Sequence, residues 1–186
     1  MTSLTIYPGN LPEHGERYTD FTDIQHQLDA LGVLIERWKA NWPLAADADQ
    51  SAVLIAYVDA IGRLMQRYDF QSVDVVKLTP NHPDKVTLRQ RFLAEHIHKD
   101  FEVRFFVEGR GLFYLHVAGK VYAVLCEQGD LISVPANTMH WFDMGADPKF
   151  ACIRLFTAAD GWVADFTGSD IAKKFPTFDQ YVAELS

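Results

Sequence analysis

The first seventy residues contain two stretches in which apolar side chains recur every three or four positions, the spacing that places them on one face of an α-helix. The first stretch covers residues 20–42 and begins with Thr22 and Gln25, which are spaced like a capping box. The second begins near Asp47 and Gln50. We predict two amphipathic helices whose apolar stripes pack into the core rather than contact a cofactor. The stripe residues are Ile24, Leu28, Leu31, Leu34, Ile35 and Trp38, and then Val53, Tyr57, Ala60, Ile61, Leu64 and Tyr68.

From Ser72 onward the pattern changes to short apolar runs that are rich in β-branched residues and separated by turn-forming residues. The run over residues 72–78 predicts a strand that ends at the turn of residues 80–83. Residues 85–93 fit either a short helix or another strand. The close spacing of the later runs predicts a small antiparallel barrel or sandwich. These runs are Val103–Val107, Gly111–Val117, Val121–Leu125, Leu131–Val134, His140–Phe142 and Phe150–Phe156, with Gly109, Gly119 and Gly129 in the turns between them.

The length of 186 residues and the 48% share of hydrophobic residues suit a single domain with a sizeable core. Within it we expect a helical N-terminal part over residues 1–70, a β-barrel over residues 71–165 and a C-terminal tail over residues 166–186. The predicted fold class is mainly β, with N-terminal α-helices.

Charge and cysteine content narrow the expected partners and compartment. The net charge of −8 offers no positive field that would recruit nucleic acid. Cys126 and Cys152 each lie in an apolar run, which favours reduced, buried thiols. The N-terminus lacks the features of a signal peptide, and no apolar run is long enough to span a membrane. We therefore expect a cytoplasmic protein that binds neither nucleic acid nor membranes.

Three histidines and a glutamate form a candidate metal site. His96 and His98 are two residues apart, so on a strand their imidazoles project from the same face. Glu102 has the same parity, and His140 would arrive from a later strand across the barrel. Three neutral nitrogens and one carboxylate oxygen suit divalent iron, nickel, manganese or zinc, and leave two octahedral positions open. An ordinary polar rim is the alternative, and it is the better explanation for a lone His-x-His pair.

The spacing of these four residues closely resembles the two motifs of the cupin superfamily. The first motif is similar to residues 96–109, HIHKDFEVRFFVEG, and the second to residues 129–140, GDLISVPANTMH. The resemblance implies a cupin-type antiparallel barrel, or jelly roll. The chain departs from the motifs at Gln90 and Asn137, where the family has Gly, and at Met144, where it has Asn. Asn tolerates left-handed backbone geometry, so the turn at Asn137 is expected to survive.

A more specific resemblance is to the acireductone dioxygenase family, on residues 92–105, FLAEHIHKDFEVRF, and 135–142, PANTMHWF. It implies an enzyme of methionine salvage that opens an acireductone, 1,2-dihydroxy-3-keto-5-methylthiopentene, with O2. The implied cofactor is one Fe(II) or Ni(II) per chain, without an organic cofactor. Fe(II) would give formate and 2-keto-4-methylthiobutyrate, and Ni(II) would give formate, CO and 3-methylthiopropionate. The resemblance also implies a monomer. The positions that match the family's ligands are His96, His98, Glu102 and His140.

Two arginines and four aromatic residues are candidates for contact with the substrate. Arg104 shares strand parity with Glu102, so we expect its guanidinium to point into the pocket and stabilise an enediolate and a peroxide-like intermediate. A surface salt bridge is the alternative. For Arg154 the pattern leaves a pocket position and a barrel-edge position open, and the family resemblance favours the pocket. The aromatic candidates for the methylthio tail are Phe92, Phe105, Phe142 and Trp162, although the parity of Phe105 is opposite to that of Arg104.

The same pattern of ligands is compatible with other functions. A different metal cupin, such as a quercetinase, an oxalate oxidase or decarboxylase, or a sugar-phosphate isomerase, can present the same four ligands. A non-catalytic cupin that binds a small ligand is the alternative from another class. Glu95 would point away from the ligands and serve as a supporting group. The remaining histidines, at positions 14, 26, 82 and 116, have no partner at ligand spacing and are expected to be ordinary exposed residues.

Overall fold

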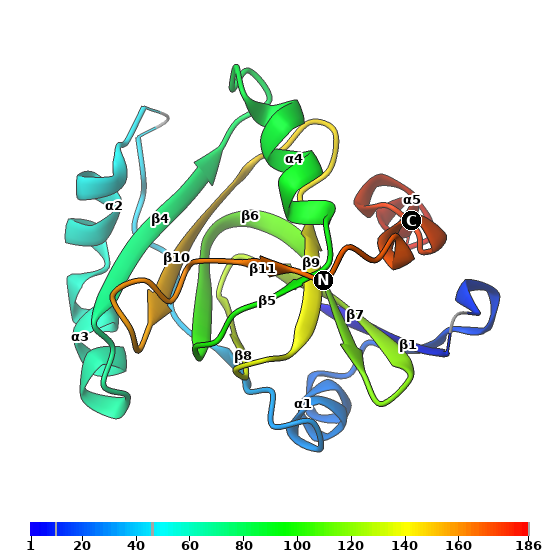
Figure 1. Cartoon of the computed structure of the whole chain (residues 1–186). Helices are drawn as coiled ribbons and strands as arrows, with labels where there is room; N and C mark the ends of the chain where they lie inside the picture. Colours follow the sequence, from blue (N-terminus) through cyan, green and yellow to red (C-terminus); the bar gives the residue numbers. More distant parts are fainter. Residues whose placement is uncertain (10, 46, 186) are drawn as a thin grey trace.

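In the computed structural model, which describes residues 1–9, 11–45 and 47–185, one long strand connects two antiparallel sheets (Figure 1). This strand is β6 (Glu102–Val117). Its first half pairs with β8 (Asp130–Val134) and β10 (Phe150–Phe156). Its second half pairs with β7 (Lys120–Glu127) and β9 (Met139–Asp143). The predicted antiparallel barrel is therefore confirmed.

Six further strands complete the two sheets among the described residues. The larger sheet has the order β11-β5-β9-β6-β7-β1-β2, and in the other sheet β4 pairs with β10 while β3 pairs with β8. Every pairing between these strands is antiparallel. The strands not yet bounded are β1 (Ser3–Pro8), β2 (Glu16–Tyr18), β3 (Ile35–Arg37), β4 (Ser72–Leu78), β5 (His96–Ile97) and β11 (Asp165–Phe166).

Gly109 lies where β6 passes from one sheet to the other. Its φ is +68°, and a Cβ at this position would lie 1.9 Å from the backbone oxygen of Lys149. The pairing of β6 with β10 shifts register close by, between Ala151 and Cys152. Only glycine combines a positive φ with so close an approach of another backbone, which explains its place in the first motif. In the second motif Asn137 has a φ of +61°, as the sequence predicted for the residue that replaces glycine there.

The helix predicted over residues 20–42 is wrong beyond residue 29. Helix α1 covers Phe21–Asp29, and the chain then turns at Gly32, with a φ of +71°, into strand β3. The predicted capping box is also wrong, because Asp20 is the N-cap and accepts hydrogen bonds from two backbone N–H groups. The side chain of Gln25 donates instead to the backbone oxygen of Ile35, at 3.0 Å.

The second predicted helix forms as two shorter ones, α2 (Gln50–Ala56) and α3 (Val58–Arg67), which meet at Tyr57 with a φ of −112°. Asp49 caps α2 by accepting a hydrogen bond from the N–H of Ala52. The expected core role of this stripe is confirmed. Its fully or almost fully buried members are Val53, Tyr57, Ala60 and Leu64. Residues 85–93, whose pattern fitted either a short helix or a strand, form helix α4 (Lys85–Leu93).

The N-terminal part is not only helical, and the C-terminal tail is not separate from the barrel. Strand β1 pairs with β7 along its whole length, which adds the N-terminus to the larger sheet. The tail contains the short 3-10 helix η2 (Ile171–Lys174) and helix α5 (Phe178–Ala183). The hydroxyl of buried Tyr181 on α5 lies 2.7 Å from Oγ1 of Thr5 on β1. A further 3-10 helix, η1 (Pro12–His14), connects β1 to β2.

The core is divided among the barrel interior, the layer between one sheet and helices α2 and α3, and a layer between the other sheet and the C-terminal tail. Leu4, Phe106 and Phe142 belong to the first cluster, and Tyr57 and Phe105 belong to the second. Both cysteines lie buried with free thiols within the described chain, as predicted. No helix in the described ranges is long and apolar enough to cross a membrane.

Candidate metal centre

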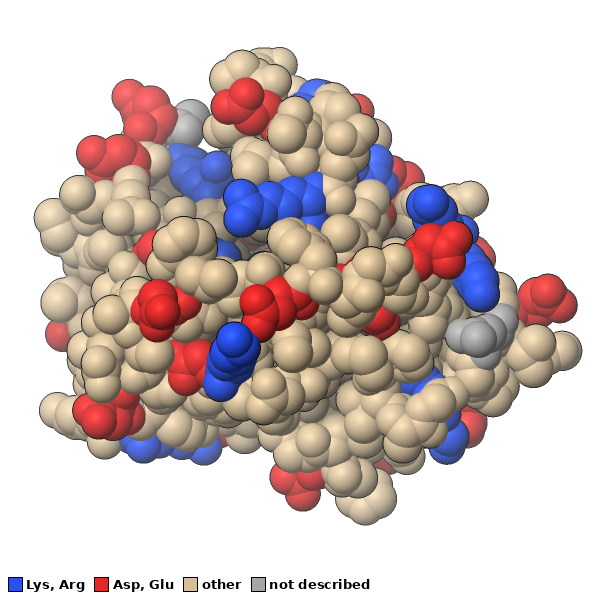
Figure 2. Space-filling view, in the orientation of Figure 1, with Lys and Arg blue, Asp and Glu red and all other residues tan. Residues whose placement is uncertain are grey.

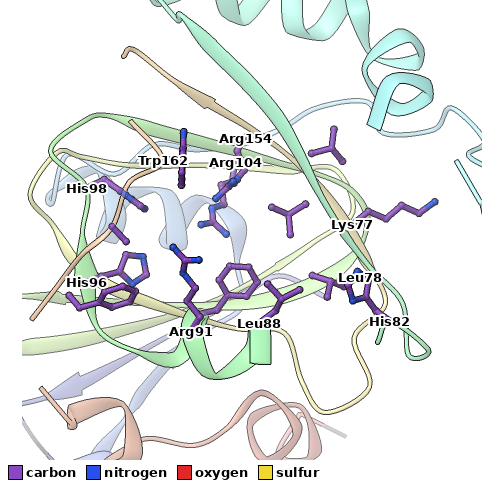
Figure 3. Close-up of a pocket in the computed structure, with 15 residues that line it drawn as sticks. Lys77, Leu78, His82, Leu88, Arg91, His96, His98, Arg104, Arg154 and Trp162 are labelled. Carbon is purple, nitrogen blue, oxygen red and sulfur yellow. The ribbon is translucent and has the colours of Figure 1, made fainter. Parts of the chain in front are cut away.

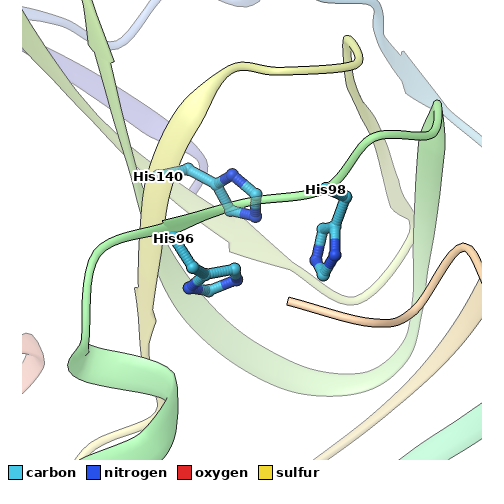
Figure 4. Close-up of side chains that lie close together, drawn as sticks. All are labelled: His96, His98 and His140. Atoms are coloured by element: carbon cyan, nitrogen blue, oxygen red, sulfur yellow. The ribbon is translucent and has the colours of Figure 1, made fainter. Parts of the chain in front are cut away.

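His96, His98 and His140 converge at one end of the barrel (Figure 4). His96 lies on β5, directly opposite His140 on β9 in the antiparallel pairing, and His98 follows one residue after β5 ends. One ring nitrogen of each histidine lies within 4.8 Å of the corresponding nitrogen of the others. All three side chains are buried. Strand alternation therefore brings together the two imidazoles of the His-x-His pair, and the β5–β9 pairing adds the third.

Backbone carbonyls fix the tautomer and orientation of the three rings. Nδ1 of His96 lies 2.8 Å from the oxygen of Ala94, and Nδ1 of His140 lies 2.7 Å from the oxygen of Thr138. Nδ1 of His98 lies 3.0 Å from the oxygen of Val163. A carbonyl oxygen only accepts hydrogen bonds, so each Nδ1 carries a proton, and in the neutral ring Nε2 presents a lone pair. This is the form in which imidazole binds a metal ion.

Glu102 joins the histidines through one of its two carboxylate oxygens. The carboxylate is completely buried, and its Oε1 accepts a hydrogen bond of 2.6 Å from Nε of Arg104. Its Oε2 lies 3.7 Å from Nε2 of His98 and 3.9 Å from Nε2 of His140. Among the described residues, these three atoms are buried without a hydrogen-bond partner.

Electrostatics keeps this donor set in the state that binds a cation. Burial lowers the pKa of His96 to about 4 and that of His140 to about 3, so both rings are neutral at physiological pH. Burial alone would raise the pKa of the Glu102 carboxyl, but Arg104, together with smaller contributions from His98, His140 and Arg154, more than offsets it and the pKa falls to about 2. At pH 7, His96 and His140 therefore present neutral nitrogens and Glu102 presents an ionised carboxylate.

The residues fit a divalent transition metal. Buried polar atoms without partners are costly, and here they are concentrated around one point. Ligand atoms that bind such an ion lie about 2.1 Å from it, which is compatible with separations of less than 4.8 Å between them. Nitrogen and carboxylate donors suit iron, nickel, manganese or zinc better than calcium. The site can therefore hold one ion and leave coordination positions open toward the adjacent cavity.

A cavity of about 350 Å³ opens beside the histidines (Figure 3). Its walls come from β4, from α4 and from the segment that follows β10. His96 and His98 lie at its polar end in Figure 3, together with Arg91, Arg104 and Arg154. Leu78 and Leu88 lie toward the other end. Figure 2 shows Lys and Arg side chains gathered near the place where β4 and α4 approach each other, while acidic side chains are scattered over the rest of that face. A small anion with an apolar tail fits this distribution of polar and apolar lining.

Comparisons with known proteins agree on one family. Residues 8–164 match the model of the ARD/ARD' family. The acireductone dioxygenase of Methylococcus capsulatus is 56% identical over 182 residues, covering 98% of both chains. That of Aquifex aeolicus is 54% identical over 185 residues, covering 98% of this chain and 99% of the relative. The chain belongs to the acireductone dioxygenase family.

A solved structure supports both the family and the presence of a metal site. The acireductone dioxygenase from Bacillus anthracis, with a cadmium ion in its active centre, superposes with a TM-score of 0.77 at 31% identity and covers 89% of this chain and 98% of its own. The fold is thus the cupin-type barrel of this family, and the protein is a dioxygenase with a metal site.

Both predicted arginines of this dioxygenase line the cavity. Arg104 is buried on β6, with its guanidinium 4.9 Å from the ring centre of Phe113 and 5.3 Å from that of Phe142. Arg154 on β10 also lines the cavity, the position that the family resemblance favoured, and it forms an ion pair with Asp74 on β4 as well. Its Nε and one terminal nitrogen donate to the two oxygens of Asp74 at 2.8 and 2.6 Å.

The four aromatic candidates divide between the cavity and the core. Phe92 and Trp162 line the cavity, and Trp162 is half exposed at its mouth. Phe142 lies behind Phe92, with ring centres 6.0 Å apart, and is not part of the lining. Phe105 lies on the opposite face of β6, packed edge-on against Tyr57. The expectation that Phe105 contacts the substrate does not fit this position, because strand alternation turns it toward the helical layer.

Several lining residues were missed by sequence reasoning. Val76 and Leu78 on β4 and Leu88 on α4 supply apolar wall, and their sequence pattern gave no reason to distinguish them from the core. His82, expected to be an ordinary exposed histidine, lines the cavity. Arg91 on α4 lies one residue before Phe92 and also lines it. The proximity of Arg91 to the first motif was the one sequence signal that could have identified it.

Glu95 and His116 contact each other beside the metal site. The sequence predicted a supporting role for Glu95 but gave no partner for it. The carboxylate of buried Glu95 lies 2.8 Å from Nδ1 of His116 and accepts a hydrogen bond of 2.7 Å from Thr167. The expectation that His116 is an ordinary exposed residue is wrong, because the pairing of β6 and β9 brings it beside the first motif. This contact attaches the segment after β11 to the strand that carries His96.

Proposed function

We propose that this protein cleaves an acireductone, 1,2-dihydroxy-3-keto-5-methylthiopentene, with O2 in methionine salvage. The single observation that carries the proposal is the set of buried, partnerless ligand atoms at the end of a cationic cavity. It supports one metal ion per chain, held by His96, His98, Glu102 and His140. The donor set of three nitrogens and one oxygen, together with the family, favours Fe(II) or Ni(II), without an organic cofactor.

The cavity residues support a defined orientation of the substrate. The enediol end lies at the histidines and the methylthio tail lies against the apolar wall of Val76, Leu78 and Phe92. Trp162 covers the mouth of the cavity, which limits the access of water.

Arg104 is proposed to act directly on the substrate. Its Nε is engaged with Glu102, so its remaining guanidinium N–H groups are available to the cavity it lines. They stabilise negative charge on the substrate oxygens, because a buried cation acts in a medium of low dielectric constant. Arg154 adds positive charge to the same wall, partly balanced by Asp74.

An ion held by His96, His98, Glu102 and His140 would supply a Lewis acid. The two enediol oxygens could chelate it, which would favour the ionised enediol and its reaction with O2. The expected products are formate and 2-keto-4-methylthiobutyrate when the ion is Fe(II). They are formate, CO and 3-methylthiopropionate when the ion is Ni(II).

The test is anaerobic mixing of the Fe(II)- or Ni(II)-loaded protein with synthetic acireductone, followed by O2. We expect the enediolate absorbance to disappear much faster than in the metal-free control, with the products stated for each ion. Failure of both metal forms to accelerate the loss would refute the proposal. A metal cupin with another substrate, or a cupin that only binds ligands, would give that result.

We also propose that the protein is a cytoplasmic monomer that binds neither nucleic acid nor membranes. The net charge of −8 and the two buried, free thiols support them. Size-exclusion chromatography with light scattering tests the oligomeric state, and a mass of two chains would contradict it.

A further inference from the structure

Arg91 is a cation without a counterion beside the metal centre. It lies near the end of α4 and lines the cavity, and its side chain is exposed to solvent. Within the described ranges, no hydrogen bond or ion pair of its guanidinium is present. Figure 3 shows the side chain pointing from α4 into the cavity, toward the side on which Arg104 and Arg154 lie.

The other arginines around the cavity have carboxylate partners. Arg104 donates to Glu102 at 2.6 Å, and Arg154 makes a bidentate pair with Asp74. These two positive charges are therefore balanced within the protein.

Lys77 also belongs to the cavity wall, but its amino group is held away from the interior. Its Nζ donates to the backbone oxygens of Ala48 and Ala45, at 2.9 and 3.2 Å. Figure 3 shows its side chain directed away from His96 and His98. Lys77 thus contributes charge to the mouth of the cavity but has its donors engaged elsewhere.

Arg89, which also lies on α4, has carboxylate partners among the described residues, unlike Arg91. Arg89 donates to both oxygens of Asp143, at 2.7 and 2.9 Å, and to Asp179 at 3.2 Å. Arg91, two residues later, points to a different face of the helix and has no such contact. In a chain with net charge −8, an unpaired guanidinium that faces two others is unfavourable unless an anion occupies the space between them.

We propose that Arg91 binds the anionic oxygens of the substrate and thereby determines its affinity and orientation. This inference rests on the proposed function, since the anion is the enediolate that enters the cavity. Arg91 binds from the α4 side, opposite Arg104, so the two guanidiniums hold the polar end of the substrate between them. Its exposure at the mouth also places it where an incoming anion is first attracted.

The test compares Arg91→Leu and Arg91→Lys with the control Arg63→Leu, in which an exposed arginine on α3 outside this cavity is removed. Both leucine variants lower the net charge equally. We expect Arg91→Leu to raise the Kd for acireductone about 10-fold, measured by anaerobic calorimetry on the Ni(II)-loaded protein, since a charge-assisted hydrogen bond is lost. Metal content should change little, kcat/KM should fall together with the affinity, and Arg91→Lys should recover part of the affinity.

Salt supplies a second readout that a purely structural role would not change. The Kd of the wild-type protein should rise as salt approaches about 1 M, where the Debye length is about 3 Å, and this rise should be smaller in Arg91→Leu. Equal Kd values and equal salt dependence in Arg91→Leu and Arg63→Leu would overturn the inference and leave the proposed function standing. If the wild-type protein binds no acireductone, the proposed function and this inference are both wrong.

Discussion

At the residue scale, the metal centre depends on backbone carbonyls as much as on the ligands themselves. His96 and His140 each place Nδ1 against the carbonyl of the residue two positions earlier in the chain. This local contact fixes the ring orientation and directs Nε2 toward the common point before an ion arrives. The site is therefore organised by the protein, which lowers the entropic cost of metal binding.

Burial of these neutral rings predicts how the stability of the metal-free protein depends on pH. The folded-state pKa values of His96 and His140, about 4 and about 3, lie below the usual value of 6.5. The unfolded chain therefore binds more protons as the pH falls from about 6.5 to about 4, and the free energy of unfolding decreases. Each ring contributes up to about 1.4 kcal/mol per pH unit. Urea unfolding of the chelator-treated protein measures this slope.

The variant His140→Gln separates this effect from general acid sensitivity. It removes one titrating ring, so the slope between pH 6.5 and pH 4 should be shallower than in the wild type. A wild-type stability that stays constant or increases on acidification over this range would contradict the assigned pKa shifts.

A second prediction at this scale concerns Arg104. Arg104→Met keeps apolar volume against Phe113 and Phe142 but removes the charge that faces the substrate. We expect kcat to fall about 100-fold, as in other sites that lose one stabilising donor. Metal content is measured on the same samples and kcat is expressed per bound ion, because Arg104→Met also removes the hydrogen bond to Glu102.

The matched control is Arg67→Met, because Arg67 forms a surface ion pair with Glu36 at 2.8 Å and lies outside the cavity. Its turnover should equal that of the wild type. Unchanged turnover in Arg104→Met would show that Arg104 has no role in stabilising the anion.

The candidate ligands could be predicted from sequence because they follow local rules. Alternation on a strand relates His96 to His98 and Glu102, and the family motif supplies His140. The pairing of Arg154 with Asp74 and the position of Arg91 could not be predicted in this way. Both depend on where β4 and α4 lie against the barrel, which is set by packing between distant parts of the chain.

At the scale of elements, β6 determines the relation between the two sheets. It carries Glu102 and Arg104 in its first half and pairs with the His140 strand in its second half. The change of sheet occurs at Gly109, where the chain passes against the backbone of Lys149. The glycine of the first motif is thus structural, and it positions the carboxylate relative to the histidines.

Gly109→Ala should destabilise the fold by about 3 kcal/mol or more, because the new Cβ meets backbone atoms and the φ is positive. Gly119→Ala is the control. Its φ of +74° is similar, but nothing lies within 4 Å of its added Cβ, so a loss of about 1 kcal/mol is expected. Chemical denaturation of both variants measures the difference. Equal losses would show that the close approach at Gly109 contributes nothing.

The elements near the N-terminus show the limit of periodicity as a predictor. Residues 30–42 continue the helical spacing of α1, yet the backbone leaves the helix and Ile35 enters strand β3. Gly32 supplies the left-handed turn, and pairing with β8 satisfies the backbone of β3. Hydrogen bonds to a strand nearly a hundred residues away outweigh a weak local preference, and nothing in the local pattern reveals that partner.

At the scale of the whole molecule, the two ends of the chain complete the barrel that holds the site. Strand β1 covers the edge of β7, and α5 packs over β1 through Tyr181. The overall barrel could be predicted from the spacing of its strands. The incorporation of the N-terminus could not, because a strand of six residues beside a distant partner has no distinctive pattern.

Because both cysteines lie in the enclosed core, we predict that their thiols do not react with alkylating reagents in the native protein. Cys126 and Cys152 are completely buried, and burial raises the pKa of Cys152 to about 12 and that of Cys126 well above its usual value. Iodoacetamide at pH 8 should modify neither thiol until urea unfolds the chain, as followed by mass spectrometry. Rapid modification of either thiol in the native protein would show that the barrel opens locally.

The metal content of ligand variants tests the central claim most directly, namely that His96, His98, Glu102 and His140 hold one ion. Elemental analysis should give one ion per wild-type chain and a large loss in His96→Ala and in His98→Ala, with the circular dichroism of a folded barrel in each. The control His14→Ala, on η1 outside the site, should retain the wild-type content. Wild-type metal content in both folded ligand variants would contradict the account.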